Sequence, residues 1–123
     1  MARDLAKSTL KRFRRKLEKE HQRLEAVLRE FEEHRDEVRL SETSSERSPD
    51  PNTAEGGSMA FELEKEFSVA QNAQDLLAKV EVAMRRIDAG TYGKCDLCGR
   101  AIPVARLEAL PHATLCVECA RSQ

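Results

Sequence analysis

The sequence contains no tryptophan, one tyrosine and four phenylalanines among its 123 residues. Aromatic side chains supply much of the buried area of compact domains, so this scarcity disfavours a thick globular core. The apolar residues are mostly Leu, Val, Ala and Ile, which suit helices packed along a narrow seam. We therefore expect an elongated, mainly helical protein.

Long apolar runs are also missing. No stretch of about 18 apolar residues occurs, which excludes an ordinary transmembrane helix. The opening, MARDLAKSTLKRFRRK, lacks the apolar stretch and small-residue cleavage site of a secretory signal. These absences predict a cytoplasmic protein without membrane contact. In a reducing compartment, cysteines favour thiolate and metal chemistry over disulfides.

An excess of either charge is absent, because 21 basic and 22 acidic residues leave a formal net charge of −1. Attraction of the whole molecule to nucleic acid or to an anionic membrane is therefore not expected. A local exception is a basic opening, which consists of Arg3, Lys7, Lys11, Arg12, Arg14, Arg15, Lys16 and Lys19. It keeps open a nucleic-acid-binding function for the first helix, although few aromatic residues are available to stack on bases.

Two segments carry apolar residues at heptad spacing, which indicates amphipathic helices that pack as a coiled coil. The first seam consists of Leu10, Phe13, Leu17, Leu24, Val27, Phe31 and Val38. The second consists of Met59, Leu63, Ala70, Ala73, Leu77, Val80, Met84 and Ile87. We expect helices over about residues 3–39 and 59–89.

Residues 41–58 (SETSSERSPDPNTAEGGS) separate these helices and show no apolar periodicity, so we expect a loop. A single polar linker between two matched seams favours an antiparallel hairpin within one monomer, residues 1–90. At about 1.5 Å per residue the hairpin would project roughly 45 Å, with the loop at its tip. A dimer through either seam is the alternative.

The second helix is expected to end at Gly90, which can adopt the left-handed conformation of a C-terminal cap. The remaining residues, 91–123, contain two Cys-x2-Cys pairs separated by 17 residues. This spacing is typical of a four-thiolate zinc site. The pattern predicts one structural Zn²⁺ held by Cys95, Cys98, Cys116 and Cys119. Gly99 can supply the positive φ of the first knuckle, and 103–110 reads as a short helical turn with Ile102, Leu107 and Leu110 facing inward.

The four cysteines leave other chemistries open. Disulfides are disfavoured by the expected compartment, and a redox dithiol lacks a strand-helix-strand context. Four thiolates could hold an iron–sulfur cluster, although these spacings differ from ferredoxin patterns. A catalytic zinc is disfavoured because four protein ligands leave no open position. His112 could replace a ligand, but the set is already full, so we expect a packing or surface role.

The segment from Ile87 to Cys119, IDAGTYGKCDLCGRAIPVARLEALPHATLCVEC, resembles the C-terminal zinc finger of the TraR/DksA family. The similarity includes the Gly-Thr-Tyr-Gly approach, the Ile-Pro step, the Arg-Leu-Glu-Ala segment and the Ala-Thr-Leu-Cys return. The preceding heptads resemble the coiled coil of the same family. Residues 61–72 (FELEKEFSVAQN) are similar to the helix that descends from its tip.

This resemblance implies a bacterial transcription regulator that binds RNA polymerase through the secondary channel, without reading DNA sequence. Such proteins use acidic residues in the tip, commonly two Asp three positions apart. In this chain one register places Asp50 and Thr53 at those positions, and the other places Asn52 and Glu55. Either register leaves one carboxylate.

Two further classes of function are alternatives to this one. A structural or assembly rod would use the hairpin as an interaction surface and the finger as an end plug. An enzyme is disfavoured, because no nucleophile–base pair, phosphate loop or pair of catalytic carboxylates can be placed on a rigid scaffold. We therefore expect a non-enzymatic protein.

Overall fold

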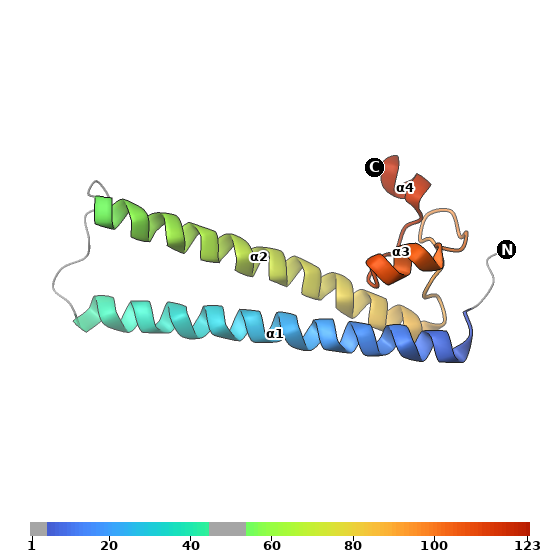
Figure 1. Cartoon of the computed structure of the whole chain (residues 1–123), viewed down its shortest axis with the longest axis horizontal. Helices are drawn as coiled ribbons and strands as arrows, with labels where there is room; N and C mark the ends of the chain where they lie inside the picture. Colours follow the sequence, from blue (N-terminus) through green and yellow to red (C-terminus); the bar gives the residue numbers. More distant parts are fainter. Residues whose placement is uncertain (1–4, 45–53) are drawn as a thin grey trace. The chain divides into compact units, whose positions relative to one another are not determined.

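A computed structural model of the chain describes residues 5–44 and 54–123, with the backbone alone for 41–44 and 54–56. It contains the helices α1 (Lys7–Ser44), α2 (Ala54–Ala89), α3 (Val104–Ala109) and α4 (Val117–Arg121) (Figure 1). Within these described ranges no β-strand forms, and Lys94 and Ala101 make an isolated antiparallel bridge. None of the described helices has the length and apolarity needed to cross a bilayer. The predicted fold class, mainly helical with two long helices and a C-terminal four-cysteine finger, is confirmed.

The chain divides into two compact units, which we describe separately. The first consists of residues 1–23 and 77–123, and the second of residues 24–76. Each long helix contributes to both units, because α1 and α2 are unbroken at the unit boundaries.

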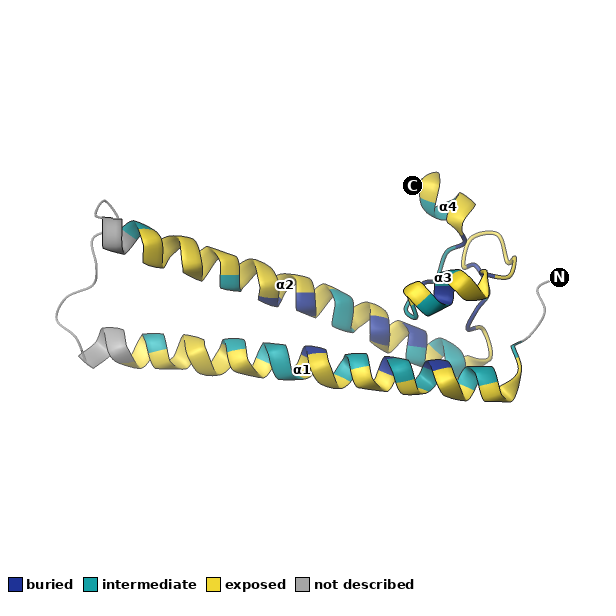
Figure 2. Ribbon diagram, viewed as in Figure 1, coloured by how far each residue is buried: buried dark blue, intermediate teal, exposed yellow. Residues whose placement is uncertain are grey.

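The core of the first unit combines the seam of the two helices with apolar residues of the finger. Its most deeply buried side chains are Phe13, Leu17, Val80 and Leu107. Figure 2 shows the buried residues of α1 and α2 in this unit on the sides where the helices meet. The helices run antiparallel here, since Arg14 pairs with Asp88 and His21 lies 3.2 Å from Glu81. Heptad periodicity thus predicted this part of the seam correctly.

The second unit pairs the remaining parts of α1 and α2 through a thinner seam. Leu24, Ala70 and Ala73 are buried in it. Farther along, the helices meet through a polar contact, in which His34 Nδ1 lies 2.8 Å from Glu66 Oε2.

Two seam positions in the second unit were predicted wrongly. Met59 and Leu63 are 45% and 43% exposed, although the heptad pattern placed them in the core. The physical reason lies on α1, where every residue from 32 to 40 except Val38 is exposed, so this part of the helix does not cover the start of α2. Apolar side chains at the start of α2 therefore have little apolar surface to cover them.

The helix ends also differ from the expected ones. Helix α1 begins at Lys7 instead of residue 3 and extends to Ser44 instead of residue 39, while α2 begins at Ala54 instead of residue 59. The expected loop over residues 41–58 is thus helical at both of its ends. Ser and Thr disfavour a helix by only fractions of a kcal/mol, and two glycines by about 1 kcal/mol each, so both helices can extend into this polar segment.

Candidate metal centre

Helix α2 ends in a glycine cap that redirects the chain toward the cysteines. Gly90 has a φ of +77°. The Thr91 N–H donates to the Arg86 carbonyl at 2.9 Å, and the Gly90 N–H donates to the Ile87 carbonyl at 3.2 Å. These two bonds form a Schellman motif, so the predicted role of Gly90 is confirmed.

The first knuckle is a tight turn that carries Cys95 and Cys98. The Gly99 N–H donates to the Cys95 carbonyl at 3.0 Å, and the Cys95 N–H donates to the Arg100 carbonyl at 2.7 Å. Gly99 has a φ of +74°, as the sequence predicted. This turn places the sulfurs of both cysteines on one side.

The second knuckle leads into helix α4, which the sequence analysis did not anticipate. Cys116 is the N-cap residue of α4, and its carbonyl accepts a 2.9 Å hydrogen bond from the Ala120 N–H. With five residues, α4 is too short to show apolar periodicity. The Asp96 N–H donates to the Thr114 carbonyl at 2.8 Å, which ties the two knuckles together.

The four cysteine sulfurs lie within 4.8 Å of one another. The Cys98 and Cys116 sulfurs are 3.7 Å apart, whereas a disulfide needs about 2.05 Å, and all four cysteines are free. In a tetrahedral site with Zn–S bonds of about 2.3 Å, neighbouring sulfurs lie about 3.8 Å apart. The donor set and its spacing therefore fit a zinc ion.

Electrostatics at the sulfurs also suit a cation. Backbone N–H groups, first that of Cys98 and then those of Cys116 and Leu97, lower the pKa of the Cys95 thiol to about 6 against the opposing effect of burial. The pKa of Cys119 is raised, mainly because its thiol hydrogen-bonds to Cys116 and Cys95. A divalent cation at this site would bind the cysteines as thiolates, so its binding would release their remaining thiol protons.

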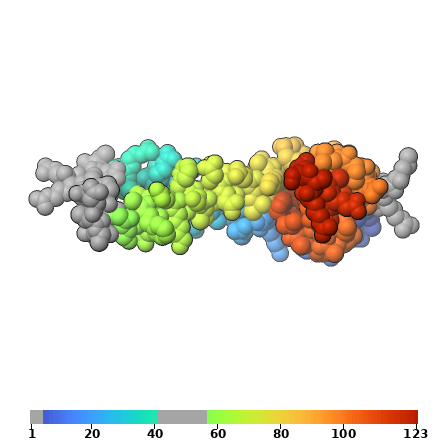
Figure 3. Space-filling model, turned by 90° about the horizontal axis from the view of Figure 1, so that it is seen from above, coloured from blue at the N-terminus to red at the C-terminus, as the bar shows by residue number. Residues whose placement is uncertain are grey.

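Between the knuckles lies α3, which matches the predicted helical turn. Ile102 and Leu107 are buried, with exposures of 3% and 0%. Leu110 was expected to face inward as well, but it is 40% exposed because the helix ends at Ala109 and the backbone at Leu110 is no longer helical. In Figure 3 the finger residues, coloured orange to red, form one continuous mass of atoms.

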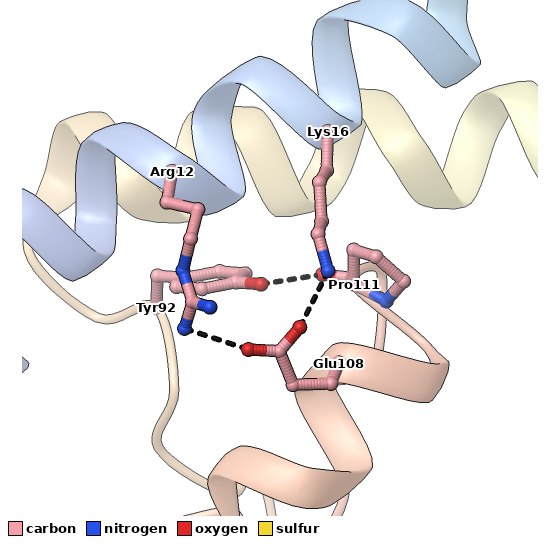
Figure 4. Close-up of polar contacts among 5 residues, drawn as sticks. All are labelled: Arg12, Lys16, Tyr92, Glu108 and Pro111. Carbon is pink, nitrogen blue, oxygen red and sulfur yellow. Dashed lines mark hydrogen bonds and ion pairs between the residues drawn. The ribbon is translucent and has the colours of Figure 1, made fainter.

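Polar contacts join α3 to α1 within the first unit. Glu108 accepts from Arg12 at 2.6 Å and from Lys16 at 2.5 Å (Figure 4). Nearby, the Tyr92 hydroxyl donates to the Pro111 carbonyl at 2.7 Å. Sequence reasoning missed these contacts, because neither heptad spacing nor the cysteine pattern identifies which surface charges pair.

Arg86 connects the end of α2 to the first knuckle. Its Nη2 donates to the carbonyls of Thr91 and Lys94, and its own carbonyl accepts from the Tyr92 N–H at 3.1 Å. This arginine was not singled out from the sequence, where it reads as an ordinary helix residue.

His112 lies outside the sulfur cluster found among the described residues. It is half-buried, and its pKa is lowered first by burial and then by the charge of Lys79. The expected packing or surface role is consistent with this environment.

The predicted tip residues lie outside the part of the chain whose side chains the structure describes. Asp50, Asn52 and Thr53 lie outside the described residues. Glu55 lies in the first turn of α2, where the structure describes the backbone alone.

The finger that carries the four cysteines matches a known protein family. Residues 90–123 match the family described as the prokaryotic dksA/traR C4-type zinc finger. The RNA polymerase-binding transcription factor DksA of Caulobacter vibrioides is 33% identical over 94 residues, which cover 76% of this chain and 63% of that protein. The structure of transcription factor DksA2 from Pseudomonas aeruginosa has a TM-score of 0.71 and 29% identity, and the match covers 95% of this chain and 84% of the other.

The chain belongs to the DksA/TraR family of zinc-finger proteins. The DksA of Haemophilus influenzae has a higher sequence identity over a shorter segment, at 40% over 60 residues. That match covers 46% of this chain and 41% of the Haemophilus protein, so the chain spans under two thirds of these curated DksA relatives.

Proposed function

We propose that Cys95, Cys98, Cys116 and Cys119 hold one structural zinc ion. The fit of the four sulfurs to a tetrahedral site and the match to a C4-type zinc finger support this ligand set. When bound, the ion would join the two knuckles, which lie far apart in the sequence. Four thiolates leave no open coordination position, so the ion acts on folding and not on a substrate.

We propose further that the protein is a cytoplasmic transcription regulator that binds RNA polymerase. The observation that carries this proposal is the extent of the similarity. The DksA2 match covers 95% of this chain, including both long helices as well as the finger. The relative from Caulobacter is named an RNA polymerase-binding transcription factor.

In this proposal the hairpin of α1 and α2 enters the secondary channel of the polymerase and modulates initiation without reading DNA sequence. No catalytic step is assigned to the protein. Asp50 or Glu55 is the acid that acts near the polymerase active site. The protein works as a monomer, because each unit pairs α1 with α2 of the same chain.

Purified core RNA polymerase and an in vitro transcription system test this function. We expect the full chain to bind the polymerase and to change promoter output. The double variant Asp50→Asn, Glu55→Gln should bind nearly as well and lose the change in output. No binding of the wild-type chain would refute the function, and an unchanged effect of the double variant would refute the role of the tip acids.

A nucleic-acid-binding function of the basic opening receives less support from the structure. Arg12 and Lys16 pair with Glu108, and Arg14 pairs with Asp88, so part of the basic opening serves contacts within the chain. A band-shift measurement with duplex DNA at low salt separates the two functions. Salt-sensitive binding of the isolated protein to DNA would favour the nucleic-acid alternative.

A further inference from the structure

The first part of α1 concentrates positive charge, only part of which is paired within the fold. Residues 7–23 carry eight Lys or Arg and two Glu, a net charge of +6, whereas the whole chain has a net charge of −1. Four of the eight basic residues recur at every fourth position, namely Lys7, Lys11, Arg15 and Lys19. We call these four residues the basic row.

The basic row lies on the solvent side of α1. All four side chains are exposed, and within the described ranges of the chain none of them makes a hydrogen bond or an ion pair. Phe13 and Leu17, which face the core, are on the opposite side of the helix because of their position in the helical repeat. Figure 2 shows exposed residues along this outer side of α1 in the first unit. The row is therefore available to a partner.

Helix stability does not explain the row. Like charges four residues apart on a helix repel one another. Lys7 also lies in the first turn, where the helix dipole disfavours a positive charge, and this turn contains no acidic residue. The neighbouring basic residues Arg12, Arg14 and Lys16 show the contrast, since each has a carboxylate partner.

The spacing of the row matches that of side chains on a second helix. Side chains four apart on a helix are about 6 Å from one another, so four of them make a row about 18 Å long. A second helix with acidic residues at every fourth position presents carboxylates at the same interval. Single-stranded nucleic acid is disfavoured, because Phe13, the one aromatic residue between 7 and 23, is buried and cannot stack on a base.

We propose that the basic row docks against an acidic helical surface of the protein partner. The inference rests on the proposed function, in that this partner is RNA polymerase. The polymerase would thus be contacted twice, by the hairpin tip and by the basic row of the first unit. The contact of the basic row would account for the salt-dependent part of the affinity for polymerase.

Binding of the full zinc-loaded chain to core RNA polymerase, measured from low to high NaCl concentration, tests the inference. The triple variant Lys11→Gln, Arg15→Gln, Lys19→Gln should raise Kd roughly tenfold at low salt, mostly through a slower association rate, and should flatten the salt dependence. The matched control is Lys79→Gln, Arg85→Gln, Arg121→Gln, which removes the same charge from exposed positions of the first unit. It should leave Kd within about twofold.

A second variant separates charge from shape. Lys11→Arg with Lys19→Arg keeps the row positive and should bind like the wild type.

If the triple row variant binds as tightly as the control, with the same salt dependence, the inference is wrong while the proposed function stands. If the wild type does not bind the polymerase, both are wrong. If the row variant loses affinity for duplex DNA and keeps it for polymerase, the row is a nucleic-acid contact.

Discussion

At the scale of single residues, glycine decides how the chain leaves α2 and enters the finger. Gly90, Gly93 and Gly99 all have positive φ, a region that side chains with a Cβ rarely adopt. Gly93 differs from the other two in its surroundings. A Cβ there would lie 2.9 Å from Leu5 Cδ1, whereas nothing lies within 4 Å of a Cβ at Gly90.

The pair Gly93→Ala and Gly90→Ala separates strain from crowding. We expect Gly90→Ala to lower the free energy of unfolding by about 1 kcal/mol, the cost of a left-handed conformation. Gly93→Ala should cost about 1 kcal/mol more, because the end of the Leu5 side chain must also move. Urea denaturation of both zinc-loaded variants measures the difference. Equal losses would show that Leu5 does not pack against Gly93.

Tyr92 links the knuckle approach to the end of α3. Loss of its 2.7 Å hydrogen bond to the Pro111 carbonyl in Tyr92→Phe should lower the free energy of unfolding by about 0.5–1.5 kcal/mol at neutral pH. Burial, and then the charge of Glu108, raise the pKa of Tyr92 above its ordinary value of 10.0. The stability that this group contributes is thus present below pH 10 and is lost as the pH rises toward the raised value.

Denaturation of the wild type and Tyr92→Phe from neutral to alkaline pH tests this assignment. The difference in stability between the two proteins should shrink as the pH rises above about 10, because the variant has no phenol to keep protonated. A difference that stays constant over this range would mean that the Tyr92 phenol is not held in its neutral form by burial.

At the scale of elements, α3 connects the metal centre to the helices of the first unit. Leu107 is completely buried, and Leu110, three residues later, is 40% exposed. We expect Leu107→Ala to cost about 2–5 kcal/mol and Leu110→Ala less than about 1 kcal/mol in denaturation experiments. A loss at Leu110 as large as that at Leu107 would contradict the observed orientation of α3.

Glu108 holds α3 to α1 through ion pairs with Arg12 and Lys16. Its pKa is lowered first by the hydrogen bond from Lys16 and then by the charge of Arg12. The stabilisation is therefore present above the ordinary carboxyl pKa and is lost as the pH falls through the lowered value. Glu108→Gln should destabilise the protein modestly at neutral pH and low salt, and the deficit should shrink in high salt.

The control for this ion pair is Glu118→Gln, which removes a more exposed carboxylate 3.6 Å from Arg100. We expect a smaller change in the denaturation midpoint from this variant than from Glu108→Gln. A larger change at Glu118 would mean that the contacts between α3 and α1 do not stabilise the unit.

Heptad spacing and cysteine spacing, both of which are local patterns, predicted much of these elements. They identified the two long helices, the cap at Gly90 and the four clustered sulfurs. They failed at Met59 and Leu63, whose exposure depends on how far α1 covers the start of α2. They also missed the Arg12–Glu108 pair, because residues 96 positions apart meet only through tertiary packing.

At the scale of the whole molecule, the sequence similarity to DksA and the structural similarity to DksA2 cover more of the chain than the metal centre does. The finger match spans residues 90–123, while the similarity to DksA2 covers 95% of the chain. The metal centre and the proposed tip acids thus belong to different parts of the sequence. The zinc ion is proposed to fold the finger, and regulation is proposed for the hairpin tip.

This division predicts that metal removal has a local effect. Zinc ligands must be deprotonated, so acid should release the ion, and a chelator should release it at neutral pH. The finger should then lose its fold, because about 30 residues cannot bury enough surface without the metal. The seam of the second unit contains no cysteine and should keep its helical structure.

The most direct measurement combines elemental analysis with hydrogen exchange of the full chain before and after chelation. The account predicts one zinc per chain, and on chelation a loss of amide protection from Cys95 onward while Leu24, Ala70 and Ala73 in the second unit keep theirs. A chain without stoichiometric zinc, or one whose finger stays protected after the metal is removed, would contradict it.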